Sequence, residues 1–148
     1  SVMLSNYSKD CETALMDNKA GVAGNWEENW LGFFGKDAEF VIELSRPTDI
    51  DDMYVGYAIC PNDWVLKPKN IMVSTSVDGV NFTEESRAEF PVYTNVKDIK
   101  RREEARVVLN KNGVKYIKVK VDNYKTLPEW HDYAGENSWI MIDEIRID

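Results

Sequence analysis

Residues 71–82 read IMVSTSVDGVNF, and this stretch carries both signals that decide the fold. Its first part alternates, so that one face of an extended chain takes the side chains of Ile71, Val73, Thr75 and Val77. Asp78-Gly79 follows directly, and this dipeptide favours the positive φ angles that a tight hairpin requires. The stretch therefore predicts a strand that ends in a tight turn, with Asn81-Phe82 opening the next segment.

Similar runs with a period of two residues recur along the chain. They cover residues 40–44, 53–59, 117–121 and 139–147. Lysines take the alternate positions of 117–121, which predicts one solvent-facing side, whereas 139–142 is apolar on both sides, as in a central strand. Asn112-Gly113 predicts a second tight turn. About eight short strands without a helical stripe predict an all-β sandwich or barrel, and this pattern alone does not select the jelly roll within that set.

Length and charge narrow the class of protein. A chain of 148 residues suits one hydrophobic core, so we expect residues 1–148 to form a single domain. It starts with Ser1 and shows no signal-peptide pattern, which predicts a fragment of a larger multidomain protein. The net charge of −8 disfavours nucleic acid and anionic membranes, and the basic cluster 97–102 is followed at once by two glutamates. No apolar run approaches the roughly 20 residues of a membrane-spanning helix, so membrane insertion is not expected.

The two cysteines, Cys11 and Cys60, leave two interpretations open. They form one disulfide bond if the protein is exported, or they are buried free thiols that pack as small apolar side chains. Because His131 is the chain's single histidine, a zinc site is not expected.

Segments along most of the chain resemble the factor V/VIII type C (discoidin) superfamily. The order of the segments and the closing stretch make the resemblance specific. Asn18 stands where that family usually has Gly, and Lys115 stands where it usually has Arg. The matching segments are ALMDNKAG at 14–21, WLGF at 30–33, FVIEL at 40–44, VSTSVDGVNF at 73–82, VKYIKV at 114–119, LPEWH at 127–131, Gly135 and WIMIDEI at 139–145.

Within that superfamily, the chain looks most similar to the C-terminal domains of bacterial β-hexosaminidases (chitobiases) and to family 32 carbohydrate-binding modules. The resemblance implies a galactose-binding-like jelly roll in an exported bacterial protein, whether periplasmic, cell-surface or secreted. It implies a non-catalytic module of a glycoside hydrolase, with two partners: a weakly bound glycan of the galactose or N-acetylhexosamine type, and the neighbouring catalytic domain. Two alternatives are a structural domain that packs on the catalytic domain without binding sugar, and a protein-binding discoidin domain.

A sugar site needs an aromatic platform and a few fixed polar groups on loops. Three tryptophans lie in loop-like sequence, and polar residues accompany two of them. The alternative for the tryptophans is that they cap the ends of the sandwich, and for the histidine that it pins its own loop, while Trp30 and Trp139 are assigned to the core. The candidate sugar-binding residues are Trp26, Trp64, Trp130, His131, Asn62 and Asp63.

The resemblance also implies one structural Ca²⁺ ion between the first loop and the last strand. Asp17 would supply a carboxylate, Lys19 a backbone carbonyl and Glu144 the closing carboxylate, a set of oxygen ligands that suits calcium. Without calcium, Glu144 is expected to pair with a Lys or Arg near the end of the sheet.

Catalysis is not expected from the motifs present. The sequence contains no nucleophile elbow, P-loop or dinucleotide-binding glycine pattern. Asp143 and Glu144 are adjacent carboxylates, but neighbours on a strand point to opposite faces and so do not form a hydrolytic pair.

Overall fold

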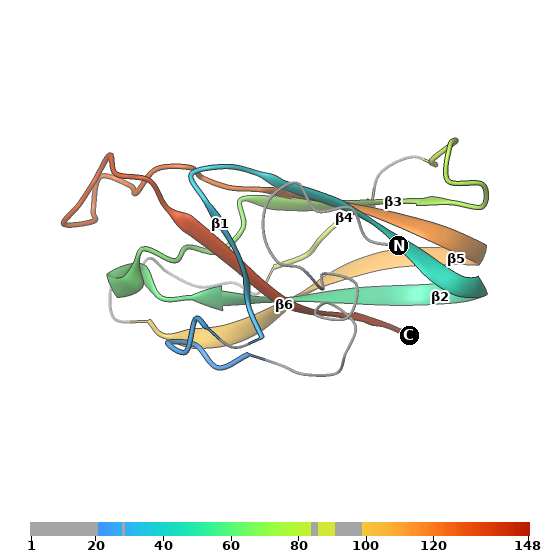
Figure 1. Ribbon diagram of the computed structural model, residues 1–148, viewed down its shortest axis with the longest axis horizontal. Helices are drawn as coiled ribbons and strands as arrows, with labels where there is room; N and C mark the ends of the chain where they lie inside the picture. Colours follow the sequence, from blue (N-terminus) through green and yellow to red (C-terminus); the bar gives the residue numbers. More distant parts are fainter. Residues whose placement is uncertain (1–20, 28, 84–85, 91–98) are drawn as a thin grey trace.

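The computed structural model describes residues 21–27, 29–83, 86–90 and 99–148, and within these ranges it is built almost entirely from β-strands (Figure 1). Every pairing between named strands is antiparallel, and the strand order is β1-β6-β2-β5-β3-β4. A short 3₁₀ turn, η1 (Pro61–Asp63), is the one helical element of the described part. The strands are β1 (Leu31–Phe34), β2 (Ala38–Ile59), β3 (Asn70–Ser76), β4 (Ser86–Arg87), β5 (Arg101–Asp122) and β6 (Trp139–Ile147).

Strands β2 and β5 are unusually long, at 22 residues each, and they pair with each other on both sides of a bend. One arm of the ladder runs from Ala38 opposite Val121 to the bend, and the other continues to Ile59 opposite Arg101. Between the arms the register of β2 shifts repeatedly over residues 43–52. Figure 1 shows both strands turning back on themselves at this point, which places the two arms in different layers.

The bend corrects one expectation from the sequence. Asn112-Gly113 was predicted to close a tight hairpin between two strands, but both residues lie inside β5. Gly113 does have the positive φ of 65°, and its amide donates a hydrogen bond to Asp49 Oδ1 at 2.9 Å. Because β5 stays paired with β2 on either side, the left-handed residue bends one continuous strand instead of ending it.

The remaining strands extend the two layers. Strand β3, with β4 beyond it, pairs with the second half of β5, whereas β6, with β1 beyond it, lies beside the second half of β2. One core fills the space between the layers, and side chains from both arms of β2 contribute to it. Its fully buried members include Phe33, Phe40, Ile42, Val55, Tyr57, Ile71, Ile117, Ile140 and Ile142. The predicted fold class is confirmed as an all-β sandwich.

The turn predicted at Asp78-Gly79 is also confirmed, and its side chains account for its shape. The Asp78 carboxylate accepts hydrogen bonds from the amides of Val80 and Asn81, each at 2.8 Å. The Ser76 hydroxyl accepts the amides of Asp78 and Gly79. These contacts satisfy the backbone groups that the strand ladder leaves behind.

Three connections gather at the end of the sandwich opposite the bend: residues 21–30, 60–69 and 123–138 (Figure 1). Backbone hydrogen bonds tie the 60–69 connection to the start of β6. The amide of Trp139 donates to the carbonyl of Trp64 at 2.8 Å, and the amide of Leu66 donates to the carbonyl of Trp139 at 3.0 Å. The start of β6 therefore fixes the position of the 60–69 connection, which follows the end of β2. No helix in the described ranges is long and apolar enough to cross a bilayer.

Candidate functional site

A pocket of about 530 Å³ opens between the 21–30 and 60–69 connections and the neighbouring strands β1 and β6. Three indoles, those of Trp26, Trp30 and Trp139, form much of its wall. Gly32, Val65 and Met141 complete the apolar surface, and the carboxylates of Glu27 and Asp63 supply the charged groups. Both acidic residues are exposed, so they lie at the mouth of the pocket and not beneath it.

Trp26 and Trp30 form a corner in this wall. Their ring centroids are 5.7 Å apart and the planes meet at 59°. Trp30 is almost completely buried, with 6% exposure, and its indole N–H donates to the carbonyl of Val22 at 3.1 Å. Trp26 is half-buried, and its indole N–H donates to Asp63 Oδ2 at 2.8 Å. The buried ring thus supports the exposed one, and the carboxylate fixes its orientation.

Trp139 enters the pocket from the start of β6. Phe34 covers part of this indole, with ring centroids 4.8 Å apart. Gly32 on the neighbouring strand makes room for the ring, because a Cβ there would lie 2.9 Å from Trp139 Cζ3. The missing side chain lets the indole lie across β1 and face the pocket.

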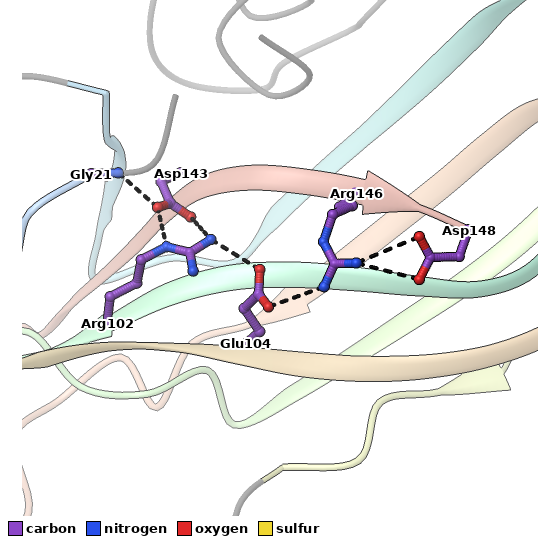
Figure 2. Close-up of polar contacts among 6 residues, drawn as sticks. All are labelled: Gly21, Arg102, Glu104, Asp143, Arg146 and Asp148. Carbon is purple, nitrogen blue, oxygen red and sulfur yellow. Dashed lines mark hydrogen bonds and ion pairs between the residues drawn. The ribbon is translucent and has the colours of Figure 1, made fainter. Parts of the chain in front are cut away.

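The loop that carries Trp26 is anchored by a buried carboxylate on β6 (Figure 2). Asp143, with 0% exposure, accepts the amide of Gly21 at 2.8 Å and the Arg102 Nε–H at 2.5 Å on the same oxygen. Arg102 Nη2 reaches the second oxygen at 3.3 Å. Because Gly21 opens the segment that leads to Trp26, the ion pair fixes the base of the loop.

This ion pair continues along the surface as a chain of alternating charges (Figure 2). Glu104 accepts from Arg102 at 3.2 Å and from Arg146 at 3.3 Å, and Arg146 also contacts Asp148 at 3.3 Å. The chain joins β5 to β6, and its members become more exposed with distance from Asp143.

The other predicted sugar-binding side chains form a separate group. Trp64 lies against Tyr133, with ring centroids 5.4 Å apart, and half-buried Trp130 lies beside His131 at 6.0 Å. Asn62 is exposed in η1, next to Asp63. Of the six predicted residues, the structure therefore places Trp26 and Asp63 in the pocket and the other four outside its lining.

His131 holds two loops together. Its Nδ1 accepts the amide of Tyr133 at 3.0 Å, so in the neutral ring Nε2 carries the proton and donates it to the carbonyl of Pro61 at 2.7 Å. The imidazole is 9% exposed. Both ring nitrogens are used inside the protein, which is the loop-pinning role that the sequence left open.

Sequence reasoning did not assign Glu27, Trp30 and Trp139 to the site. The two tryptophans were expected in the core, and Trp30 is indeed buried, yet both also face the pocket. A signal was present in the sequence, because Trp30 directly precedes β1 and Trp139 begins β6, so each lies where a loop meets a strand. Alternation identifies the buried face of a strand, but it does not show whether a buried ring at the end of that strand also lines a surface pocket.

The predicted calcium ligands are only partly within the described residues. Glu144 is buried, with 7% exposure, and so offers a carboxylate of the kind that calcium binds. Asp17 and Lys19 lie outside the described residues. No group of three or more His, Cys, Asp or Glu side chains in the described ranges is arranged to hold a metal. Calcium therefore stays a prediction.

Cys60 is a buried free thiol, and burial raises its pKa. It packs with Trp30 and Val65 behind the pocket wall, as a small apolar side chain does. Cys11 lies outside the described residues.

Comparison with known proteins gives low similarity. The chain matches no protein-family model and no curated protein. Among solved structures it is similar to "CBM32 of AlyQ in complex with 4,5-unsaturated mannuronic acid", with a TM-score of 0.48, 11% identity, and coverage of 100% of this chain and 93% of that one. It is also similar to "CpGH89CBM32-4, produced by Clostridium perfringens, in complex with glcNAc-alpha-1,4-galactose", with a TM-score of 0.46, 14% identity, and coverage of 99% and 88%. At this level of similarity, neither structure assigns a role to any residue of this chain.

Proposed function

We propose that this chain is a non-catalytic carbohydrate-binding module and that the pocket around Trp26 is its sugar site. The observation that supports this proposal is one pocket that combines three indole walls with two carboxylates at its mouth. Pyranose rings present C–H faces that pack on indoles, and their hydroxyls donate to carboxylates, so this combination suits a sugar.

The geometry of the pocket favours the binding of a single pyranose ring at the end of a glycan. Trp26 is the accessible platform, because it is half-buried while Trp30 behind it is buried. Asp63 is already oriented by the Trp26 N–H, so its remaining lone pairs are fixed for a sugar hydroxyl. A shallow site that buries little area gives weak affinity for a single sugar, which a module can offset by tethering.

The two carboxylates do not favour hydrolysis. A glycosidase needs one carboxyl group to stay protonated as the general acid, and burial in an apolar site is how enzymes achieve this. Glu27 and Asp63 are both exposed. We therefore assign them to binding, and release of nitrophenol from nitrophenyl glycosides by the purified chain would contradict this assignment.

The wider setting is part of the same proposal. The resemblance of the sequence motifs to modules of bacterial glycoside hydrolases supports an exported protein in which this domain recruits a catalytic domain to glycans. Galactose and N-acetylhexosamines are the sugars that the resemblance favours.

The test is a titration of the purified chain with galactose, N-acetylgalactosamine, N-acetylglucosamine, glucosamine and their oligosaccharides, followed by calorimetry and Trp fluorescence. Trp26→Ala should weaken binding at least about tenfold, because it removes the stacking surface. Tyr124→Ala is the matched control, because Tyr124 is an exposed aromatic residue outside the pocket lining. The proposal would be overturned if the chain bound no glycan on a broad array, or if both variants lost the same amount of affinity.

A further inference from the structure

We infer that the pocket prefers a sugar carrying a protonated amine, so that its ligand is a glycan with free amino groups instead of N-acetylated ones. The inference rests on the proposed function, because it names the kind of sugar for the same pocket. Two features carry it: the corner formed by two indoles and the pair of carboxylates at its mouth.

The indole corner favours a cation. The face of an indole carries partial negative charge, and an ammonium group near two such faces gains from both. Trp26 offers the accessible face of this corner, and Trp30, which is 6% exposed, closes the corner behind it, with planes inclined at 59° and centroids 5.7 Å apart. A neutral N-acetyl group gains only the apolar contact.

The two carboxylates also favour a positively charged ligand. In the described part of the chain, neither Asp63 nor Glu27 takes part in an ion pair. The side-chain partners of Asp63 are the N–H of Trp26 and the thiol of Cys60, and both are neutral, so they orient the carboxylate without cancelling its charge. Both negative charges therefore act on whatever enters the pocket.

No basic side chain lines the pocket in the described residues. Lys100 lies beside the same loop, where a Cβ on Gly24 would be 2.6 Å from its Nζ, but it is not part of the lining. The net charge of −8 adds a long-range attraction for cations and a repulsion for uronic acids. The charges at the pocket and the net charge of the chain thus both favour a cationic sugar.

The experiment compares oligomers of glucosamine with oligomers of N-acetylglucosamine of the same length by calorimetry, below the pKa of the sugar amine and at low salt. The free amine should bind about tenfold more tightly, the effect of a modest cation–π gain together with charge attraction. Added salt should shrink this preference, because the carboxylates are exposed and easily screened. A mannuronate oligomer should not bind.

Three variants locate the preference. Asp63→Asn keeps an acceptor for the Trp26 N–H while removing the charge, and Glu27→Gln removes the other charge. Each should reduce the preference for the amine, and the double variant should abolish it. Glu39→Gln, on an exposed position of β2, changes the net charge equally and should leave the preference intact.

The possible results separate this inference from the proposed function. Equal or tighter binding of the N-acetylated oligomer overturns the inference and leaves the sugar site standing. No binding of either oligomer, or of any other glycan, overturns both. Unchanged preference in the double variant, or equal competition by lysine amide, which has the cation without the pyranose, also overturns it.

Discussion

The carboxylate of Asp143 in β6 and the guanidinium of Arg102 in β5 are joined across β2 by hydrogen bonds of 2.5 and 3.3 Å. Strand β2 lies between their strands, and Gly56 occupies the crossing point, since a Cβ there would lie 2.0 Å from Asp143 Oδ1 and 2.3 Å from Arg102 Nη2. One glycine of β2 therefore permits an ion pair that joins β5 to β6, and the same carboxylate also binds the amide of Gly21.

Replacing Asp143 by Asn should lower the free energy of unfolding by about 2 kcal/mol. The change removes the charge opposite a partly buried guanidinium. The cost is below that of a fully buried pair, because Arg102 keeps 25% of its side chain exposed. Urea denaturation measures it. The control is Asp148→Asn at the exposed end of the same chain of charges, which should change stability by less than about 0.5 kcal/mol. Similar effects for the two variants would show that the buried pair has no special role.

Replacing Gly56 by Ala should destabilise the fold by about 2 kcal/mol, because the added methyl group must displace the ion pair. The control is Gly135→Ala in the 123–138 connection, where a Cβ meets no atom within 4 Å. That control carries only the cost of its left-handed backbone, about 1 kcal/mol, since its φ is 91°. Thermal melting of both variants compares them, and a Gly56→Ala protein as stable as the native chain would contradict the crossing described above.

The turn at Asp78 should make stability sensitive to acid. Hydrogen bonds from the amides of Asn81 and Val80, followed by those from the side chains of Asn81 and Ser76, hold the pKa of Asp78 below its ordinary value of 3.8. A depressed pKa means that the folded protein favours the charged form. The contribution is therefore complete above the ordinary value and is lost as the pH falls below it toward the lower pKa of the folded state.

The measurement is the melting temperature as a function of pH for the native chain and for Asp78→Asn. The native chain should lose melting temperature more steeply than the variant below the ordinary pKa of an aspartate. Parallel curves for the two proteins would mean that the turn contributes nothing to the acid response.

Calcium binding by Asp17, Lys19 and Glu144 can be tested directly. If these residues hold the ion, Ca²⁺ at about 100 times its dissociation constant should stabilise the protein by about 2.7 kcal/mol. Mg²⁺ should do less, because it dehydrates reluctantly and demands a stricter geometry. Glu144→Gln should remove the response to Ca²⁺, with melting in the presence of a chelator as the baseline. A native chain whose melting is the same with Ca²⁺ and with the chelator would argue against the ion.

The fold was predictable because its signals are local. Alternation at 71–77 and the Asp78-Gly79 dipeptide each act within a few residues. The turn forms as predicted, and the strand forms as far as Ser76, whereas Val77 lies beyond it and is exposed. The bend at Gly113 was not predictable in the same way. Asn112-Gly113 has the same chemistry whether its flanking strands pair with each other or with a third strand, and only the partner decides between a hairpin and a bend.

The site was predictable in part for the same reason. Loop tryptophans are visible in the sequence, and Trp26 with Asp63 lies in the pocket. Which loops meet depends on tertiary contacts, such as that between Trp26 and Asp63, separated by 37 residues. The histidine was open to two interpretations because only its neighbours in space, Pro61 and the Tyr133 amide, decide how its nitrogens are used.

The passage of β2 and β5 through both layers has a consequence for how the molecule comes apart. In a sandwich of two independent sheets, one sheet can detach while the other keeps its ladder intact. Here, detaching either layer disrupts the pairing of the same two strands, β2 and β5. We therefore expect amide protons on both sides of the bend to exchange in a single cooperative opening. The domain should then open as one folded ribbon, with both layers losing their protection together.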